Sequence, residues 1–442
     1  MKIIYFIILP YPSHYMSCFA LAHEFEKKGY KVIFTGNSPN LQNLVKQNDF
    51  EYVEMAYQTE DVVPNLKYFF SFFILSILSK SFLFKRYREF YANIIEVKRL
   101  MSLTKADYVF IDAHLYQYYF YFSREKCKVF LLNTKLLTSQ KGNNPPLSTD
   151  YLPKTNLISR ITNELLWIKV IMQHKFQSAK MKFMFLGKDD EFFTKRFCIK
   201  NNIPYETIIN RRNVFYYGIK NVKRILLASE FLDLFASKDE NHNYYICLEY
   251  KRKEDDMLNN SNYIALKNEI SEIKNRKIIL CSFGTVINEK DKAKIDFLNR
   301  LNIAVKDENY LLIVVSKNPN IISNRNTNVR VVPSIPQLDL LQSCDLMIHH
   351  AGLNTIKECL QFQVPMLIYT PKEKSFDRVG NASRIQFNGL GLVGNIYTDS
   401  PIKIKENIEK AMLIKMPKQN YEQEYSKLNK FIDENIANSL NN

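Results

Sequence analysis

Glycine and tryptophan are scarce in this chain of 442 residues, which has 11 glycines and one tryptophan. Its seven cysteines form no C-x-x-C pair and mostly lie inside apolar runs, which argues against a disulfide framework and a cysteine-based zinc site. Fixed-period repeats and low-complexity tracts are missing too, apart from an Asn-rich tail. We therefore expect reduced core cysteines and a cytoplasmic protein.

The chain contains no segment with the full pattern of a signal peptide or a membrane-spanning helix. The apolar run at the N-terminus breaks at Pro10 without a small-residue cleavage site, which predicts a buried first strand. Residues 66–84 approach the length that spans a bilayer, but they include four serines and Lys80. We expect a buried or acceptor-lining helix there. Since Lys85, Arg86 and Arg88 follow, peripheral contact with the inner membrane face is the alternative.

The formal net charge of +16 comes from Lys and Arg residues spread along the chain rather than gathered in a tail. Such a charge favours acidic partners: phosphorylated small molecules, anionic membrane surfaces or nucleic acid. Because no nucleic-acid recognition motif accompanies the dispersed charge, we expect no binding to nucleic acid.

Short apolar strands alternate with helical segments in both halves of the chain. The strands predicted in the first half span residues 2–9, 30–36, 106–113, 128–134 and 224–229. Those predicted in the second half span residues 277–283, 310–316, 329–333, 345–350 and 364–369. This alternation indicates parallel sheets of crossover units, and hence an α/β protein with two Rossmann-like, doubly wound domains facing a cleft.

A polar, charge-dense stretch near residue 255 separates the two halves. We predict an N-terminal domain over residues 1–248, a linker over 249–275 and a C-terminal domain over 276–416. A C-terminal helix within residues 417–442 is expected to pack back on the N-terminal domain. Ligands of doubly wound sheets bind at the carboxyl ends of the strands, so a site is expected there in each domain.

The stretch IHHAGLNTIKE, residues 348–358, forms a His-His-x-Gly corner between a strand and a helix. A helix start exposes unpaired backbone N–H groups and the positive end of the helix dipole, which together bind anions. His350 can add a donor, while Asn354 and Thr355 can cap the helix or reach a phosphate. Glu358, one turn later, can accept both hydroxyls of a ribose. An ordinary strand-turn-helix with an Asn cap is the alternative.

Other glycines and polar residues follow neighbouring strands of the second half. Gly284 and Thr285 end one strand, Gly352 makes the turn of the His-His corner, and Gln337 precedes a helix. Six of the 11 glycines lie between Gly284 and Gly394, where a closely approaching ligand would need them.

These residues resemble the nucleotide-sugar signature of the family 1 glycosyltransferases, the UDP-glycosyltransferase superfamily of GT-B fold, and are most similar to its bacterial macrolide-type branch. The resemblance covers residues 334–391, where a P-Q pair, an H-x-G-x-N-[ST]-x-x-E block, a QVP triplet and a D-x-x-x-N-A block occur in family order. It implies a base contact from Gln337, a diphosphate site at Thr285, His350, Asn354 and Thr355, a ribose contact from Glu358, and contacts to the sugar hydroxyls from Asp377.

Two positions in this stretch depart from the family pattern. Ser334 stands where an aromatic residue commonly stacks on the base. Arg378 replaces the Gln that usually follows the sugar-binding Asp, and two extra residues precede Asp377. Together with Gly284 and Gly352, Arg378 completes the predicted donor site.

The segment LPYPSHYMS is similar to the family's opening, in which G-H-x-x-P precedes the first helix and the His is the catalytic base. Here Ser13 stands for the Gly and Ser17 for the Pro, and we expect His14 in a loop before the helix. Asp112 ends a strand at the same edge, where the family carries the Asp that pairs with the base. Such an Asp fixes the imidazole tautomer and stabilises the imidazolium. His114 is a rival base; a solvated His14 and a helix-capping Asp112 are the alternatives without catalysis.

The resemblance implies an inverting hexosyltransferase that uses a nucleotide sugar, expected to be a UDP-sugar, as co-substrate and has no other cofactor. Enzymes of a different fold place a metal on a D-x-D motif, which this sequence lacks, so no metal is expected. Tyr and Phe together number 58. Many lie between Tyr52 and Tyr121, where the family builds its acceptor pocket, so we expect the N-terminal domain to bind a lipophilic, hydroxyl-bearing acceptor. The alternatives are a membrane-docked lipid glycosyltransferase, a nucleotide-sugar epimerase of similar fold, and a catalytically silent, nucleotide-sugar-binding partner of another transferase.

Overall fold

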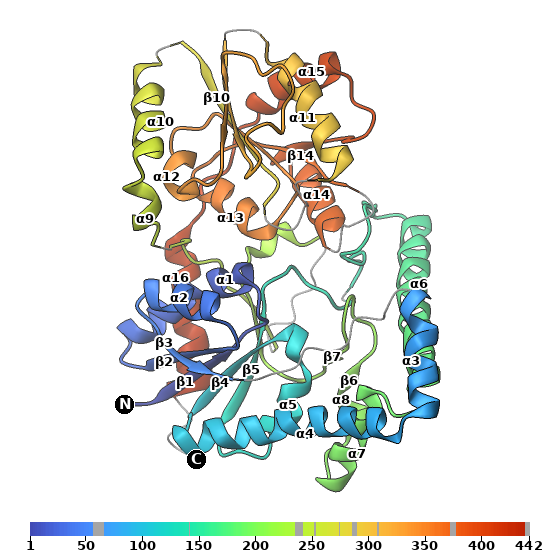
Figure 1. Ribbon diagram of the computed structural model, residues 1–442. Helices are drawn as coiled ribbons and strands as arrows, with labels where there is room; N and C mark the ends of the chain where they lie inside the picture. The colour runs from blue at the N-terminus through green and yellow to red at the C-terminus, as the bar shows by residue number, and fades with distance from the viewer. Residues whose placement is uncertain are drawn as a thin grey trace.

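The computed structural model describes residues 1–55, 66–140, 142–234, 242–251, 253–273, 275–284, 290–306, 309–371 and 377–437. Within these ranges the chain forms two domains, each built on a parallel sheet, as the alternation of strands and helices predicts (Figure 1). Thr285, expected at the diphosphate, lies outside the described residues.

The N-terminal sheet is parallel and has the strand order β3-β2-β1-β4-β5-β8-β9. Its strands are β1 (Ile3–Ile7), β2 (Lys31–Gly36), β3 (Glu51–Glu54), β4 (Tyr108–Asp112), β5 (Lys128–Asn133), β8 (Arg224–Leu226) and β9 (Asn243–Tyr245). Every residue of β4, and all of β1 except Ile3, is buried. Strands covered by helices on both faces need such continuous apolar sequence, which is why the central strands could be predicted.

The helices of the N-terminal domain differ greatly in length. They are α1 (Pro12–Lys27), α2 (Pro39–Gln47), α3 (Leu66–Leu78), α4 (Lys80–Leu103), α5 (Gln117–Phe122), α6 (Leu157–Met184), α7 (Asp190–Lys200) and α8 (Tyr205–Ile208), with a small hairpin of β6 (Ile209–Asn210) and β7 (Gly218–Ile219). Proline is favoured in the first turn, so α1 begins at Pro12. His14 therefore lies in the first turn of α1, not in a preceding loop as expected.

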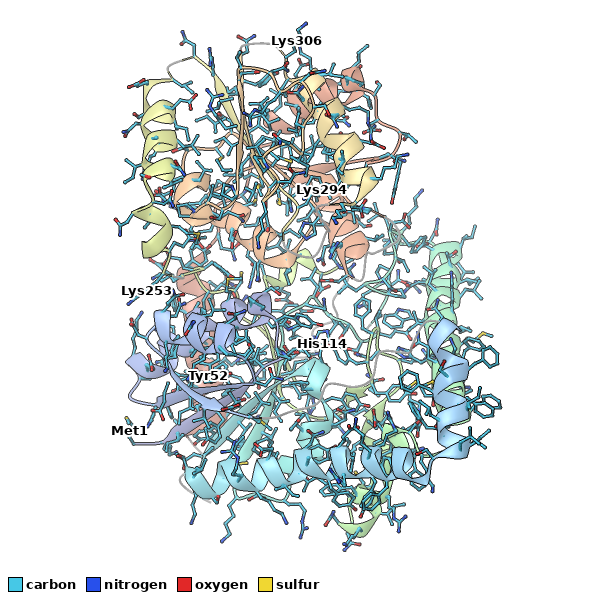
Figure 2. All side chains as sticks on the ribbon, viewed as in Figure 1. Met1, Tyr52, His114, Lys253, Lys294 and Lys306 are labelled. Atoms are coloured by element: carbon cyan, nitrogen blue, oxygen red, sulfur yellow. The ribbon has the colours of Figure 1, made fainter. Side chains whose placement is uncertain are left out.

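The apolar stretch over residues 66–84 differs from its prediction. It is broken at Ser79 between α3 and α4, and on the described part of α3 the side chains of Ile74, Ile77 and Leu78 are exposed. The expectation of a buried helix is therefore wrong for α3, which stands beside α6 at one edge of the molecule (Figure 2). None of the described helices is long and apolar enough to cross a membrane.

The C-terminal sheet is also parallel, with the strand order β12-β11-β10-β13-β14-β15. Its strands are β10 (Lys277–Ser282), β11 (Tyr310–Val315), β12 (Val329–Val332), β13 (Leu346–His349), β14 (Met366–Tyr369) and β15 (Gly391–Gly394). The helices that follow or flank them are α9 (Asp255–Leu258), α10 (Ser261–Glu272), α11 (Lys292–Ala304), α12 (Gln337–Leu341), α13 (Leu353–Gln361), α14 (Arg378–Phe387) and α15 (Pro401–Met412). All ten strands predicted from the sequence are present.

Two helices near the ends of the C-terminal domain show where the chain crosses between the domains. α10 falls within the predicted linker, yet its Tyr263, Leu266 and Ile270 join the core of the C-terminal domain. α16 (Tyr421–Ile432) follows the C-terminal domain but packs Leu428 and Phe431 into the core of the N-terminal domain. The chain therefore passes between the domains twice (Figure 1).

The two domains meet at α14. Gly380 packs so closely that an added Cβ would lie 2.1 Å from the carbonyl oxygen of Leu147. One turn later Arg384, 1% exposed, donates from Nε to Asp233 Oδ1 at 3.2 Å and from Nη2 to the carbonyl oxygen of Pro145. Asp233 is itself 7% exposed as a residue and fully buried as a side chain. A buried charge pair thus joins the two domains.

Removing one partner of this pair should be costly. We expect Arg384→Ala to lower the free energy of unfolding by about 3 to 5 kcal/mol, because it leaves the Asp233 carboxylate buried and unpaired. The matched control is Arg330→Ala, which breaks the half-exposed pair with Glu269 and should cost about 0 to 1 kcal/mol. Urea unfolding of both variants checks this. If both variants lost the same free energy of unfolding, burial of the Arg384–Asp233 pair would not decide how much it contributes to stability.

The two histidines after β13 give a second expectation, for the pH dependence of stability. Burial lowers the pKa of His349 to about 3 and, with the Arg378 charge, holds the pKa of His350 well below its usual range. Below about pH 6.5 the unfolded chain binds protons that the folded one does not, so stability is complete above this pH and falls as the pH drops. His349→Gln should reduce the slope of stability against pH, by about 1.4 kcal/mol in total between pH 7.5 and 5.5, because the unfolded imidazole takes up its proton gradually around pH 6.5. Urea unfolding between pH 7.5 and 5.5 measures it; an unchanged slope would contradict a neutral His349.

Candidate active site

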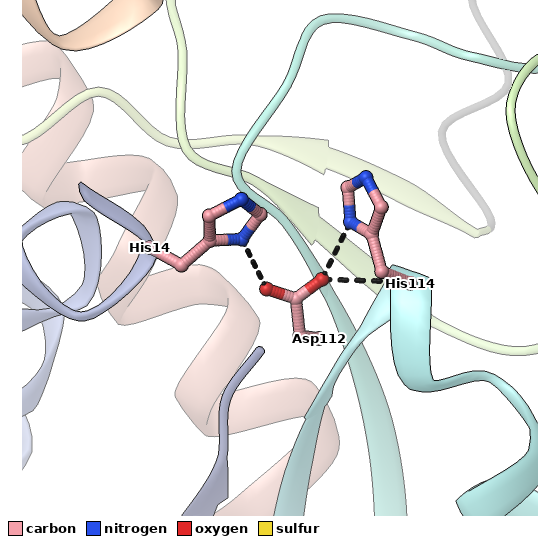
Figure 3. A group of neighbouring side chains, drawn as sticks. All are labelled: His14, Asp112 and His114. Carbon is pink, nitrogen blue, oxygen red and sulfur yellow. Dashed lines mark hydrogen bonds and ion pairs between the residues drawn. The ribbon is translucent and has the colours of Figure 1, made fainter. Parts of the chain in front are cut away.

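The N-terminal half of the site is a cluster of His14, Asp112 and His114 (Figure 3). His14 Nδ1 lies 2.6 Å from Asp112 Oδ2, and His114 Nδ1 lies 2.8 Å from Asp112 Oδ1. Asp112 is the last residue of β4 and is fully buried, whereas the side chains of His14 and His114 are 13% and 18% exposed. The predicted pair of His14 and Asp112 is therefore brought together, and the rival His114 is bonded to the same carboxylate.

The buried carboxylate is stabilised in its charged form. Burial alone would raise the pKa of Asp112, but the charges and hydrogen bonds of His14 and His114 outweigh it and hold the pKa below its usual range. An ionised carboxylate only accepts hydrogen bonds, so both Nδ1 atoms carry protons and each neutral ring keeps its lone pair on Nε2. Burial lowers the pKa of His114, so this ring is neutral at pH 7. Either Nε2 can act as a base.

Thr134 also belongs to this cluster. It follows β5, and its hydroxyl lies 2.9 Å from His14 Nδ1. The sequence analysis did not single it out, although the predicted strand over residues 128–134 ends at it and neighbouring parallel strands end at the same edge of a sheet.

The three side chains are also close enough to hold a metal ion. Among the described residues, His14, Asp112 and His114 offer one ligand atom each within 4.8 Å of one another. Both Nδ1 atoms, however, already face the Asp112 carboxylate in hydrogen bonds. These hydrogen bonds form the imidazole–carboxylate network that the sequence analysis expected for His14 and Asp112. That the protein uses no metal stays a prediction.

The C-terminal half of the site surrounds the start of α13. Gly284 follows β10 with φ +62°, and a Cβ there would lie 2.9 Å from His350 Cε1. Gly352 is the N-cap of α13 and has no side chain to cap it, while Ala351 before it takes the left-handed conformation with φ +65°. The glycines keep the backbone close to the His350 ring and leave the helix start uncapped. The alternative of an Asn cap is not observed.

His350 has an unsatisfied atom at this position. Its Nδ1 is buried and has no hydrogen-bond partner, and the residue is 8% exposed. Buried polar atoms are nearly always paired, so an orphan atom beside an uncapped helix start is a mark of a ligand site. The low pKa of His350 makes the ring a neutral donor.

Asn354 joins the two domains. Its Nδ2 donates to the carbonyl oxygen of Ser13 at 2.8 Å, and its Oδ1 accepts from the Ser17 hydroxyl at 2.6 Å. Its side chain is thus bonded to α1 on both sides of His14, while Thr355 is half-exposed in the first turn of α13. The first turn of α1, with the candidate base, and the first turn of α13 therefore lie next to each other.

Two further predicted residues meet at the other side of α13. Gln337, the first residue of α12, donates from Nε2 to Oε2 of Glu358, whose side chain is almost fully buried. The residues expected at the base and at the ribose are therefore neighbours.

Asp377 is paired with a residue that the sequence analysis missed. Lys135, two residues after β5, lies with Nζ 2.8 Å from Asp377 Oδ1. Burial would raise the pKa of Asp377, but Lys135 outweighs it and lowers the pKa to about 2. Arg378 beside it is 5% exposed and has no partner at Nη1. Lys135 could have been found in the same way as Thr134, because it directly follows the strand predicted over residues 128–134 and so lies at the edge of the sheet where ligands bind.

Comparison with known proteins agrees with this arrangement. Residues 302–430 match the family described as the C-terminal domain of erythromycin biosynthesis protein CIII-like proteins. Two relatives from Bacillus subtilis (strain 168) are each 28% identical to part of the chain. The uncharacterized UDP-glucosyltransferase YdhE aligns over 22% of this chain and 25% of its own length, and the NDP-glycosyltransferase YjiC over 26% and 29%. The matches cover about a quarter to a third of the curated relatives.

Solved structures match the chain along almost its whole length. CalG4, the calicheamicin glycosyltransferase, has a TM-score of 0.62 at 14% identity, and the alignment covers 98% of this chain and 94% of that one. The spinosyn rhamnosyltransferase SpnG, complexed with thymidine diphosphate, has a TM-score of 0.57 at 12% identity over the full length of both chains. At such identities the likeness shows the fold. The chain thus has the GT-B fold, and the match of residues 302–430 to the C-terminal domain of the erythromycin biosynthesis protein CIII-like family agrees with the resemblance found in the sequence.

Proposed function

We propose that this protein is an inverting, metal-independent glycosyltransferase that moves a sugar from a nucleotide diphosphate sugar to a hydroxyl of a lipophilic small molecule. The observation that carries the proposal is the contact of Asn354 with Ser13 and Ser17. It sets an imidazole–carboxylate pair beside an uncapped helix start that can bind an anion. A base and an anion site side by side are the two parts that the reaction needs.

In this proposal His14 is the general base. Its Nε2 removes the proton from the acceptor hydroxyl while the oxygen attacks the anomeric carbon. Asp112, held in its charged form, fixes the tautomer and stabilises the imidazolium that forms. Attack opposite to the leaving diphosphate inverts the anomeric centre.

The leaving diphosphate is stabilised by the C-terminal domain. The backbone N–H groups at the start of α13 and the neutral His350 ring donate to the developing charge. Gly284 and Gly352 let the backbone approach the phosphates. Fixed donors in a site that excludes water supply the stabilisation that other folds obtain from a metal.

The remaining contacts define the rest of the donor site. Gln337 and Glu358, already neighbours, would contact the base and the ribose. Asp377 would accept hydrogen bonds from the sugar hydroxyls, with Lys135 and Arg378 holding its charge in place. We assign the donor as a UDP-sugar, since Glu358 suits a ribose with both hydroxyls.

The comparisons support the reaction class. The curated relatives YdhE and YjiC are named as a UDP-glucosyltransferase and an NDP-glycosyltransferase. Structures of SpnG are complexed with thymidine diphosphate and with spinosyn aglycone. A lipid glycosyltransferase docked on a membrane would use the same residues on another acceptor, and a silent partner protein would have no use for the pair of His14 and Asp112.

The ribose contact can be tested with nucleotides alone. UDP should bind more tightly than 2′-deoxy-UDP by about 1.5 to 3 kcal/mol, the contribution of a hydrogen bond to a charged group. Deoxy-UDP and dTDP, which differ only in the methyl group of the base, should then bind alike. Calorimetry measures all three, and Glu358→Gln should narrow the gap between UDP and deoxy-UDP. Equal binding of UDP and deoxy-UDP would remove the argument for a UDP-sugar.

The role of His14 as the base can be tested by measuring the transfer rate and the UDP affinity of each variant on the same preparation. His14→Ala should lower kcat by roughly 10² to 10⁴ with UDP affinity almost unchanged, because the ring acts on the acceptor. Asp112→Asn should also be slow, and the two losses should not add, since the residues work as one unit. His350→Ala should instead weaken UDP binding.

His114→Ala is the matched comparison, because it removes the other ring on the same carboxylate. We expect His114→Ala to lower kcat less than His14→Ala does. If His14→Ala keeps near-normal transfer to a poorly acidic alcohol while His114→Ala loses it, the base is His114.

A further inference from the structure

α6 is apolar on the side that faces solvent. Six of its exposed residues follow one another at intervals of three or four, with side chains between 44 and 71% exposed: Leu157, Ile161, Leu165, Ile168, Met172 and Phe176. At about 100° per residue these positions fall within an arc of roughly 100°. They form one continuous strip along the helix, which we call the α6 strip.

The opposite side of α6 faces the protein with Ser159, Asn163, Trp167 and Val170, two of which are polar side chains. Trp167 is fully buried and donates from Nε1 to the carbonyl oxygen of Asn144 at 2.9 Å. An ordinary surface helix buries its apolar side and exposes its polar side. α6 buries Trp167 and Val170 but leaves its longest apolar row exposed, so the packing of the domain does not explain the α6 strip.

Basic residues border the α6 strip. Within α6 there are five Lys and Arg residues and a single acidic one, Glu164. Arg160 and Lys175 lie at one edge of the strip, with Glu164 between them and paired with Arg212, and Lys169 lies at the other edge; all four residues of α6 are exposed. An apolar face with cationic edges is the pattern of a helix that lies in the plane of a membrane surface.

α3 extends this surface. It packs on the C-terminal end of α6, where the ring of Phe73 stacks on Phe183 at 4.5 Å. Its own Ile74, Ile77 and Leu78 are 51, 55 and 78% exposed. The two helices stand together at one edge of the molecule, away from both sheets, and their side chains project from it (Figures 1 and 2).

We propose that the α6 strip, with the exposed side of α3, is a docking surface for a bilayer that contains anionic lipids. The strip is about 29 Å long from its first residue to its last, enough for a helix to lie flat in the headgroup region. A helix of this pattern lies in the plane of the interface rather than across the bilayer. This proposal does not rest on the transfer reaction.

The charge of the surface decides between a membrane and a second copy of the chain. Two copies meeting through the α6 strip would bring two sets of basic edges together, on chains that each carry a net charge of +16. An anionic bilayer instead presents negative charge to those edges and apolar chains to the strip.

Flotation of the full chain with vesicles tests the proposal. Binding to phosphatidylcholine vesicles with about a third phosphatidylglycerol should exceed binding to pure phosphatidylcholine, and should fall several-fold between low and high salt. The double variant Ile168→Glu/Met172→Glu should lower the partition coefficient at least about tenfold, since it puts two anions into the apolar strip. Lys169→Gln/Lys175→Gln should lower it on anionic vesicles only.

The matched control is Ile402→Glu/Leu413→Glu, the same change at residues 74 and 81% exposed in the C-terminal domain, which should bind as the parent does. The fluorescence of Trp167, the one tryptophan of the chain, reports whether α6 stays packed in each variant. UDP affinity should not change, which separates this test from that of the reaction. The proposal is overturned if anionic vesicles bind no protein at low salt, if the control loses binding equally, or if sedimentation finds a dimer that the α6 variant dissociates.

Discussion

The bond between Asn354 and α1 is the interaction on which the candidate site depends. Asn354 reaches both the Ser13 carbonyl and the Ser17 hydroxyl, so the first turn of a helix from each domain is fixed against the other. In the proposed reaction neither half acts alone, because the proposed base, His14, lies in one domain and the helix start proposed to bind the diphosphate lies in the other. In this proposal the Asn354 amide therefore sets the position of the C-terminal domain relative to His14.

Charge pairs also hold the two domains together. Arg384 is paired with Asp233, both fully buried, and Asp377 is paired with Lys135, both largely buried. Charges buried between domains must be paired, and an ion pair has one good geometry whereas apolar contacts allow many. The interface therefore combines a polar alignment with an apolar core that contains Leu136, Leu147 and residues of the C-terminal sheet.

The central strands and the residues at their carboxyl ends were predictable, because strands buried on both faces appear as unbroken apolar runs. β3, whose sequence is EYVE, lies at the edge of its sheet and has no such run. The pairing of Lys135 with Asp377 was not predictable, since no local pattern reports a contact between distant segments. For α6 the periodicity is present in the sequence, but periodicity alone does not tell which side of a helix faces the protein. The break between α3 and α4 at Ser79 was not predicted either, because the length and apolarity of a segment show neither where a helix ends nor which residues are buried.

The return of α16 to the N-terminal domain affects how the protein forms during synthesis. Leu428, Phe431, Ile432 and Ile436 lie in the core that covers one face of the first sheet, although the other buried residues of that core all come from residues 4–248. Domains usually fold in order as they leave the ribosome. Here the first domain cannot complete its core until the second has been made, so an unfinished apolar face of the nascent chain persists until translation has passed residue 436.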